Sequence, residues 1–175
     1  MLEKWDVYSV DRKKLAKTVT SDDELLKNEY RIVIGVCVFN SSNQLLIQQR
    51  QKCKKTWPNM WDITASGSVI SGETSSEAVA RELREELGLD ISFKDMLPQM
   101  SVGFSKGFED YYFVEADVDI NQMVLQKEEV QDVKWATLEE VKDLMHQGLF
   151  IPYHEHLIGL CFEMKTVYGS YKYEG

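Results

Sequence analysis

Three glutamates, Glu82, Glu85 and Glu86, follow one another at i, i+3 and i+4 spacing. In a helix this spacing places all three carboxylates on one face within a single turn, where like charges repel by roughly a few tenths of a kcal/mol per pair. They also fall towards the C-terminal end of the predicted helix, where the helix dipole disfavours anions. A bound divalent cation would reverse this repulsion, and oxygen ligands suit Mg²⁺ or Mn²⁺. The pattern therefore predicts a metal site, with a solvated acidic face as the alternative.

The residues around this helix favour the metal site. Residues 74–77 (Thr-Ser-Ser-Glu) fit a capping box and Gly88 is a typical C-terminal stop, so residues 76–87 are predicted to be helical. Glu73 lies just before the helix and Arg81 lies inside it. An ion pair between these two side chains would hold the preceding glycine-containing segment over the carboxylate face. A merely solvated acidic helix needs no such arrangement.

The same residues belong to a longer pattern that covers residues 67–89. All nine defined positions of G-x5-E-x7-R-E-U-x-E-E-x-G-U are matched, where U is an aliphatic residue. The segment therefore resembles the box of the Nudix family, whose enzymes hydrolyse a diphosphate linked to another moiety and use divalent cations. The resemblance implies an α/β fold, a Nudix-type α/β/α sandwich around a mixed β-sheet. It leaves the substrate open.

Carried onto this chain position by position, the Nudix resemblance implies a role for each matched residue. The expected metal ligands are three side chains and one backbone carbonyl: Glu82, Glu85, Glu86 and Ser66. The expected cofactor is Mg²⁺, with Mn²⁺ as the alternative. Glu73 and Arg81 would form a structural clamp. Metal ions would neutralise the charge that develops on the phosphate oxygens and lower the pKa of a bound water.

The position of the general base stays open between two places. Some Nudix enzymes use the first Glu of the helix motif, here Glu82, and others use a Glu from a later loop. Glu128 and Glu129 precede the strand predicted around Trp135 and are the later-loop candidates. A solvated turn is the alternative interpretation of this pair.

A second resemblance extends upstream of the box, to type 1 isopentenyl diphosphate isomerases, which share the Nudix fold and carry an N-terminal extension. It rests on residues 30–33, 39–40, 45–46, 50, 54–55, 57–58 and 61. It implies that Arg50 and Lys54 bind the substrate diphosphate, and cationic side chains suit a phosphate group. Trp57, on the same basic loop, is expected to be exposed near the substrate. A solvated lysine loop is the alternative.

The isomerase activity itself is disfavoured. Isomerases need a catalytic cysteine followed two residues later by a metal-binding histidine, whereas residues 66–68 read Ser-Gly-Ser, and an upstream metal-binding histidine falls at Tyr30. Serine is a poor acid for protonating a carbon–carbon double bond. We therefore expect a metal-dependent hydrolase that cleaves a phosphoanhydride bond of a nucleoside diphosphate-linked or related diphosphate substrate. An isomerase-like enzyme and a non-catalytic nucleotide-sensing module are the alternatives.

Composition limits the partners of the chain. Its 175 residues, 43% of them hydrophobic, suit one domain with a substantial core. The formal net charge of −9 opposes binding to nucleic acid polymers and anionic membranes. The longest apolar run, residues 32–39, is too short to span a bilayer, and three cysteines without a C-x-x-C pair suggest reduced thiols in a cytoplasmic protein. The predicted partner is a small-molecule diphosphate, and monomer and homodimer both stay open.

The elements that must position these residues alternate irregularly between strand and helix. Residues 1–29 are expected to form an N-terminal β extension of the same domain, and residues 30–175 the Nudix hydrolase domain. Residues 21–28 are expected to form a short helix or a turn. Predicted strands cover residues 5–10, 15–19, 32–39, 45–50, 111–116 and 133–135; predicted helices cover residues 76–87, 138–147 and 154–168.

Substrate selectivity is expected to lie in loops around residues 52–60 and 100–110. Glu109 and Asp110 lie near the place where the isomerases have a catalytic acidic residue, and the alignment is ambiguous by one position. Four aromatic residues in this part of the chain could stack on a substrate or belong to the core: Phe104, Phe108, Tyr111 and Tyr112.

Overall fold

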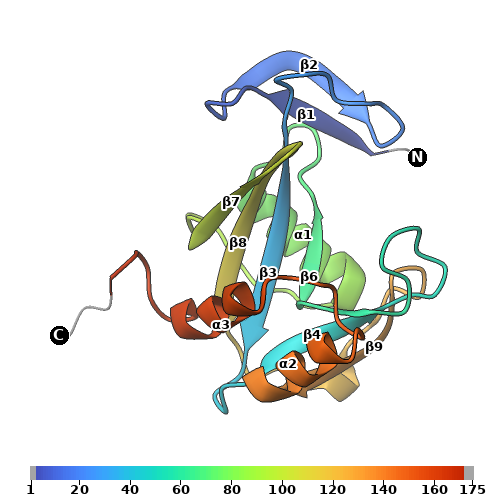
Figure 1. Cartoon of the computed structure of the whole chain (residues 1–175), viewed down its shortest axis with the longest axis vertical. Helices are drawn as coiled ribbons and strands as arrows, with labels where there is room; N and C mark the ends of the chain where they lie inside the picture. The colour runs from blue at the N-terminus through green and yellow to red at the C-terminus, as the bar shows by residue number, and fades with distance from the viewer. Residues whose placement is uncertain (1–2, 172–175) are drawn as a thin grey trace.

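The structure, a computed structural model, describes residues 3–171 and contains one mixed seven-stranded sheet (Figure 1). Its central strand β3 (Arg31–Phe39) pairs in parallel with β8 (Gly107–Glu115) along its whole length. On its other side β3 pairs antiparallel with β6 (Ala65–Ser68) and β4 (Leu45–Arg50). The remaining strands are β7 (Met100–Phe104), which pairs with β8, and β5 (Trp61–Asp62) and β9 (Val130–Ala136), which pair with β4.

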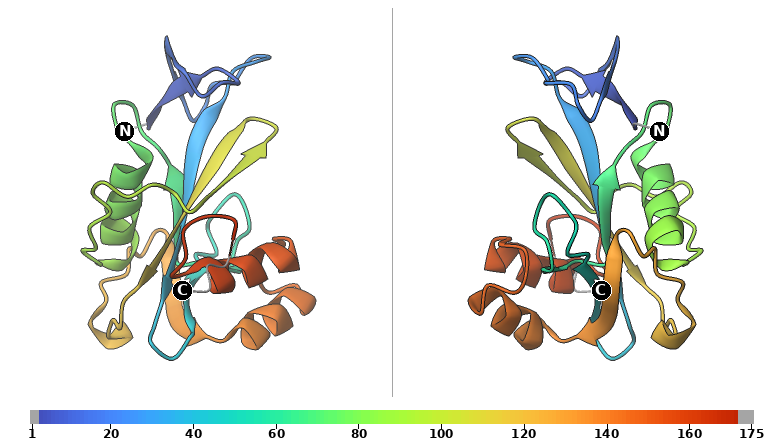
Figure 2. Two further views of the ribbon diagram at one scale, coloured as in Figure 1. Left: turned by 90° about the vertical axis from the view of Figure 1, so that its left-hand side faces the viewer. Right: turned by 90° about the vertical axis from the view of Figure 1, so that its right-hand side faces the viewer.

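Helices cover both faces of this sheet (Figure 2). Helix α1 (Ser75–Leu87) packs on one face, and α2 (Leu138–His146) and α3 (Glu155–Met164) pack on the other. A short 3₁₀ helix, η1 (Ile120–Gln122), lies between β8 and β9. The predicted α/β/α sandwich is therefore confirmed.

The long apolar run at residues 32–39 forms most of β3. Ile34 and Val36 pack in the cluster that contains α1, whereas Cys37 and Phe39 pack in the cluster that contains α2 and α3. Successive strand side chains point to opposite faces, so β3 is buried on both sides. This two-sided burial explains why its sequence does not alternate between polar and apolar residues.

A separate two-stranded sheet lies at one end of the main sheet (Figure 1). It consists of β1 (Lys4–Tyr8) and β2 (Lys14–Thr20), which pair antiparallel and overlap the two strands predicted at residues 5–10 and 15–19. Backbone hydrogen bonds of 2.8 and 3.0 Å join Tyr8 to Tyr30, the residue before β3. The hairpin is thereby placed next to the N-terminal end of the central strand.

Residues 21–28 form turns, which is one of the two forms that the sequence predicts for them. Other stretches differ from the prediction. Strand β7 was not predicted, because its side chains are mostly exposed and show no alternation of burial; its pairing with β8 creates it. Helix α3 ends at Met164 and does not reach residue 168, because Thr166 and Val167 are β-branched and extend a helix poorly.

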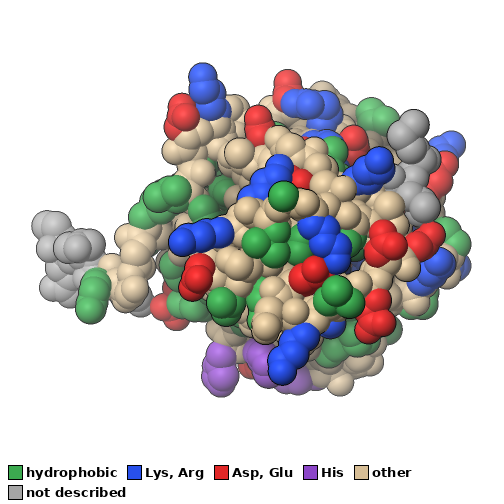
Figure 3. Space-filling model, turned by 90° about the horizontal axis from the view of Figure 1, so that it is seen from above, with side chains coloured by type: hydrophobic (Ala, Val, Ile, Leu, Met, Phe, Trp, Pro, Cys, Tyr) green, Lys and Arg blue, Asp and Glu red, His purple; other side chains and the backbone are tan. Residues whose placement is uncertain are grey.

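The end of the molecule that carries the hairpin has a mixed surface. In the view of Figure 3, Lys and Arg side chains alternate with Asp and Glu side chains and do not form one continuous basic patch. Within residues 3–171, none of the helices combines the length and the hydrophobicity that a membrane span needs.

Candidate active site

Helix α1 is capped at both ends. At its start the Thr74 hydroxyl accepts a hydrogen bond from the Glu77 N–H (3.3 Å), and the Glu77 carboxylate accepts one from the Thr74 N–H (2.8 Å). At its end Gly88 adopts a left-handed conformation (φ 69°) and its N–H donates to the Arg84 carbonyl. The predicted capping box and stop are confirmed. They place the three glutamates in the second half of the helix.

The three glutamates have unequal environments. Glu82 and Glu86 are buried, with 8% and 6% of their surface exposed, whereas 54% of the Glu85 side chain is exposed. Burial raises the pKa of Glu82 to about 7. Burial and then repulsion from Glu82 raise the pKa of Glu86 to about 8. A bound cation would stabilise the charged form of two buried carboxylates that lie close together.

Arg81 joins the helix to the segment that precedes it. Its guanidinium donates to both carboxylate oxygens of Glu73 (2.9 and 3.0 Å) and to the Ser68 carbonyl (3.0 Å). The expected ion pair between Glu73 and Arg81 is therefore present, with two-point geometry. The same guanidinium also donates to Glu82 (2.9 Å) and Glu85 (3.2 Å). The glycine-containing segment is thus held on the carboxylate face of α1.

Gly67 permits a very close approach between this segment and the helix. A Cβ atom at this position would lie 2.0 Å from Glu82 Oε1, so the carboxylate lies directly against the Gly67 backbone. Strand β6 holds Ser66 and Gly67 in place, because they pair with Gly35 and Ile34 of β3. A larger residue at 67 would displace Glu82.

A cavity of about 330 Å³ opens beside these residues, between β3, β6, β8, α1 and the loops before β5 and β9. Its wall carries both acidic and basic side chains. It is lined by five of the residues predicted to form the site: Arg50, Lys54, Ser66, Glu86 and Glu129. Carboxylates that suit a cation and cations that suit a phosphate therefore share one cavity.

The loop after β4 supplies the basic side of the cavity. The Arg50 guanidinium donates to the Thr56 carbonyl (3.3 and 3.4 Å) and lies 3.7 Å from the buried carboxylate of Asp62. Lys54 forms an ion pair with Glu129, which comes from the loop before β9. Two loops that are far apart in the sequence are joined at this point.

The structure separates the remaining loop candidates. Glu129 lines the cavity, and its charge contributes to the raised pKa of Glu86. Glu128 is exposed and does not line the cavity; its backbone carbonyl accepts a hydrogen bond from the Cys53 thiol (3.8 Å). Trp57 is 47% exposed, as expected, and also lies outside the cavity wall.

Strand register distinguishes Glu109 from Asp110. Glu109 pairs with Val33 of β3 and lines the cavity. Asp110 points to the opposite face of the sheet. There it is buried and accepts two hydrogen bonds from Arg12 (2.9 and 2.7 Å). The four aromatic residues considered for stacking do not line this cavity: Phe104, Phe108, Tyr111 and Tyr112.

Arg31 is a cavity residue that the sequence interpretation missed. It is the first residue of β3, and its Nη1 donates to Ser68 Oγ (2.9 Å). One signal could have identified it: an arginine at the first position of a buried strand has to direct its guanidinium to solvent or into a polar cavity.

The donor set of the carboxylate face fits a hard divalent cation, because such ions prefer oxygen ligands. Among residues 3–171, however, acidic side chains do not converge into a ready group of three or more ligands. Arg81 contacts both Glu82 and Glu85, and Glu86 accepts a hydrogen bond from Gln48 (3.0 Å). Of the two carboxylates that Arg81 contacts, Glu85 is the exposed one.

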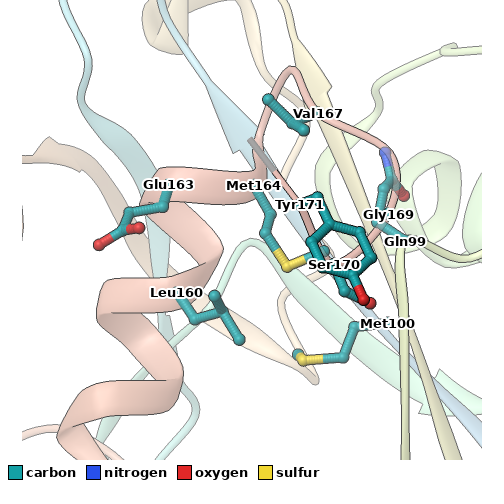
Figure 4. Close-up of a pocket in the computed structure, with 9 residues that line it drawn as sticks. All are labelled: Gln99, Met100, Leu160, Glu163, Met164, Val167, Gly169, Ser170 and Tyr171. Atoms are coloured by element: carbon teal, nitrogen blue, oxygen red, sulfur yellow. The ribbon is translucent and has the colours of Figure 1, made fainter. Parts of the chain in front are cut away.

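A larger cavity of about 640 Å³ shares no lining residue with the first one. It lies between α3, β7 and the segment after α3, and Figure 4 shows its lining side chains. Much of this wall is apolar: Met100, Leu160, Met164, Val167 and Tyr171. None of the residues expected to carry chemistry is found there, so volume alone does not locate the site.

Comparison with known proteins agrees with this geometry. The model of the NUDIX domain matches residues 29–155. The chain belongs to the Nudix family. It is 42% identical over 165 residues to an uncharacterised Nudix hydrolase of Listeria innocua, covering 94% of this chain and 96% of the relative. The crystal structure of DR0079 from Deinococcus radiodurans superposes with a TM-score of 0.73 at 25% identity, covering 91% of this chain and 99% of that one. The predicted family, fold and enzyme class are confirmed, and Nudix hydrolases generally use divalent metal cations.

The predicted similarity to the isomerases is also present within this Nudix chain. It is 29% identical over 123 residues to an isopentenyl-diphosphate Delta-isomerase of Salmonella arizonae, covering 66% of each chain. In the described part of the chain, however, no cysteine lines the cavity. Cys37 and Cys161 are buried in the core, and Cys53 is exposed.

Proposed function

We propose that this Nudix protein hydrolyses a phosphoanhydride bond of a nucleoside diphosphate-linked or related diphosphate compound with the help of Mg²⁺ or Mn²⁺. One observation supports this proposal above the others. A single cavity has Glu86 of the box helix on one side and the cationic side chains of Arg50 and Lys54 on the other. A metal-bound diphosphate needs both kinds of group within reach of each other.

In this proposal α1, the helix of the Nudix box, holds the metal. Its expected ligands are Glu82, Glu85, Glu86 and the backbone carbonyl of Ser66. Ser66 and Glu86 line the cavity, and Glu82 lies against Gly67 beside it. An ion held by these residues would supply positive charge for the phosphate oxygens and would make a water molecule more nucleophilic. Arg81 and Glu73 hold the segment in place.

The basic loop binds the diphosphate. Arg50 is already fixed by the Thr56 carbonyl and is only 13% exposed at its side chain. Lys54 is paired with Glu129, so substrate phosphate has to replace that carboxylate as its partner. The release of Glu129 makes it the later-loop candidate for the general base, and Glu82 is the helix candidate. The exposed position of Glu128 gives it no such access.

The proposal is tested by measuring phosphate release from nucleoside di- and triphosphates, dinucleotides, sugar nucleotides and isoprenoid diphosphates, with Mg²⁺, Mn²⁺ or EDTA. Glu86→Gln serves as the blank and Glu139→Gln, on the exposed surface of α2, as the matched control. We expect metal-dependent turnover of at least one class, lost in Glu86→Gln and kept in Glu139→Gln. Equal turnover in the wild type and Glu86→Gln would contradict the proposed site.

A further inference from the structure

The three basic residues of the cavity differ in how their charge is balanced. Lys54 is neutralised by Glu129, and Arg50 lies near Asp62. Arg31 is half-buried and forms no ion pair within 4.0 Å with a carboxylate of residues 3–171; the acidic group that acts on its charge is the exposed Glu3, which lies beside Trp5. A half-buried charge that is balanced only by an exposed carboxylate is incompletely compensated, so an anionic ligand would be stabilised beside Arg31.

The side chain of Arg31 is nevertheless held firmly. Its Nη1 donates to Ser68 Oγ (2.9 Å), and its guanidinium carbon lies 4.4 Å from the centre of the Trp5 ring. These contacts use one of the five N–H donors and one planar face of the guanidinium. The other donors are available for a ligand in the cavity that Arg31 lines.

Trp5 belongs to the N-terminal hairpin of β1 and β2, which also contacts the segment between β6 and α1. The Asp6 carboxylate accepts hydrogen bonds from Ser71 Oγ (2.8 Å) and from the Gly72 N–H (2.9 Å). The Ser71 N–H donates to the Lys4 carbonyl (2.7 Å). The hairpin is therefore attached to the segment between β6 and α1, and it holds Trp5 beside Arg31.

We propose that Arg31, positioned by Trp5 of the N-terminal hairpin, binds an anionic phosphate group of the substrate and makes the hairpin part of the active site. This inference rests on the proposed diphosphate chemistry and adds a binding residue and a positioning residue to it. Arginine suits this role because its fork of donors matches two phosphate oxygens at once.

The first test measures binding of inorganic pyrophosphate by calorimetry in EDTA, where metal-dependent turnover does not contribute. We expect Arg31→Gln to raise the dissociation constant about tenfold or more, because a charge-assisted contact is lost. Arg31→Lys keeps the charge without the fork and should lie between the two. Arg84→Gln, an exposed arginine on α1, is the matched control and should bind like the wild type. An unchanged constant in Arg31→Gln, or no binding of pyrophosphate by the wild type, would overturn the inference.

The second test separates positioning from folding. With a substrate that the wild type hydrolyses, Arg31→Gln should raise KM more than it lowers kcat, and Trp5→Leu should raise KM about threefold. Both variants should keep the shift in melting temperature that Mg²⁺ produces. A KM unchanged in both variants would contradict the inference while leaving the hydrolase proposal intact. Conversely, loss of pyrophosphate affinity in Arg31→Gln without turnover of any tested substrate would contradict the hydrolase proposal alone.

Discussion

Helices α1 and α2 begin in the same way and use their acidic residues in opposite ways. Both start with a Thr whose side chain and backbone exchange hydrogen bonds with a Glu three residues later, Thr74 with Glu77 and Thr137 with Glu140. In α2 the acidic residues Glu139 and Glu140 lie in the first turn, where the helix dipole favours them.

In α1 the additional acidic residues Glu82, Glu85 and Glu86 lie in the second half, and two of them are buried. In this half of the helix the dipole disfavours negative charge, and the three carboxylates also repel one another. Glu139 and Glu140 of α2 follow the rules of helix stability, although Asp143 lies in the second half of that helix. In α1, by contrast, two acidic residues of the second half are also buried. This burial of like charges distinguishes the helix that carries the proposed chemistry.

The largest expected difference between the two helices is in catalysis. Glu86→Gln should lower metal-dependent turnover about a hundredfold or more, because the proposed ligand loses its charge. Glu139→Gln should change turnover less than about twofold. The melting temperature of Glu86→Gln should not fall, since burial already raises the pKa of Glu86 to about 8 and an amide avoids the cost of a buried carboxylate. Steady-state kinetics and thermal melts check both statements, and a similar loss in the two variants would remove the contrast.

The next difference concerns metal binding. Millimolar Mg²⁺ should raise the melting temperature of the wild type by about 2–4 °C, because the ion binds the folded state alone. The shift should be much smaller in Glu85→Gln and unchanged in Glu139→Gln. A wild type that melts at the same temperature with Mg²⁺ and with EDTA would favour a solvated acidic face on α1.

Loss of the N-cap side chain should destabilise the protein equally in α1 and α2 but should lower activity only in α1. Thr74→Ala and Thr137→Ala should each lower the free energy of unfolding by about 1 kcal/mol, because each removes an N-cap side chain. Turnover should fall about two- to fivefold only in Thr74→Ala, since α1 alone carries the proposed ligands. Urea unfolding and kinetics measure the two effects. Equal activity of the two variants would show that the start of α1 does not position its glutamates.

The smallest expected effect is a pH dependence that the helices share. Hydrogen bonds from the Thr74 and Thr137 N–H groups and hydroxyls hold the pKa of Glu77 and Glu140 below their ordinary value of 4.5. Their contribution to stability is therefore present above pH 4.5 and is lost as the pH falls through the lowered pKa. Unfolding measured between pH 6 and 3 should show a shallower decline in Glu77→Gln and in Glu140→Gln. A decline that both variants leave unchanged would contradict this origin.

Much of the fold and of the helix site could be predicted from local sequence. The spacing of Glu82, Glu85 and Glu86 places them on one face because helix geometry is local, and the caps at Thr74 and Gly88 set the limits of α1 for the same reason. The central strand β3 was predicted from its uninterrupted apolar run.

The rest of the cavity depended on contacts between distant parts of the chain. The ion pair of Lys54 with Glu129 spans 75 positions, and strand register alone directs Glu109 into the cavity and Asp110 away from it. Arg31 lines the cavity because β6 and the N-terminal hairpin meet at the start of β3. The sequence by itself determined the box helix, because its pattern is fixed by neighbours within a turn. Only the tertiary structure decided what faces that helix, because the pairing of strands and loops is set by the packing of the whole domain.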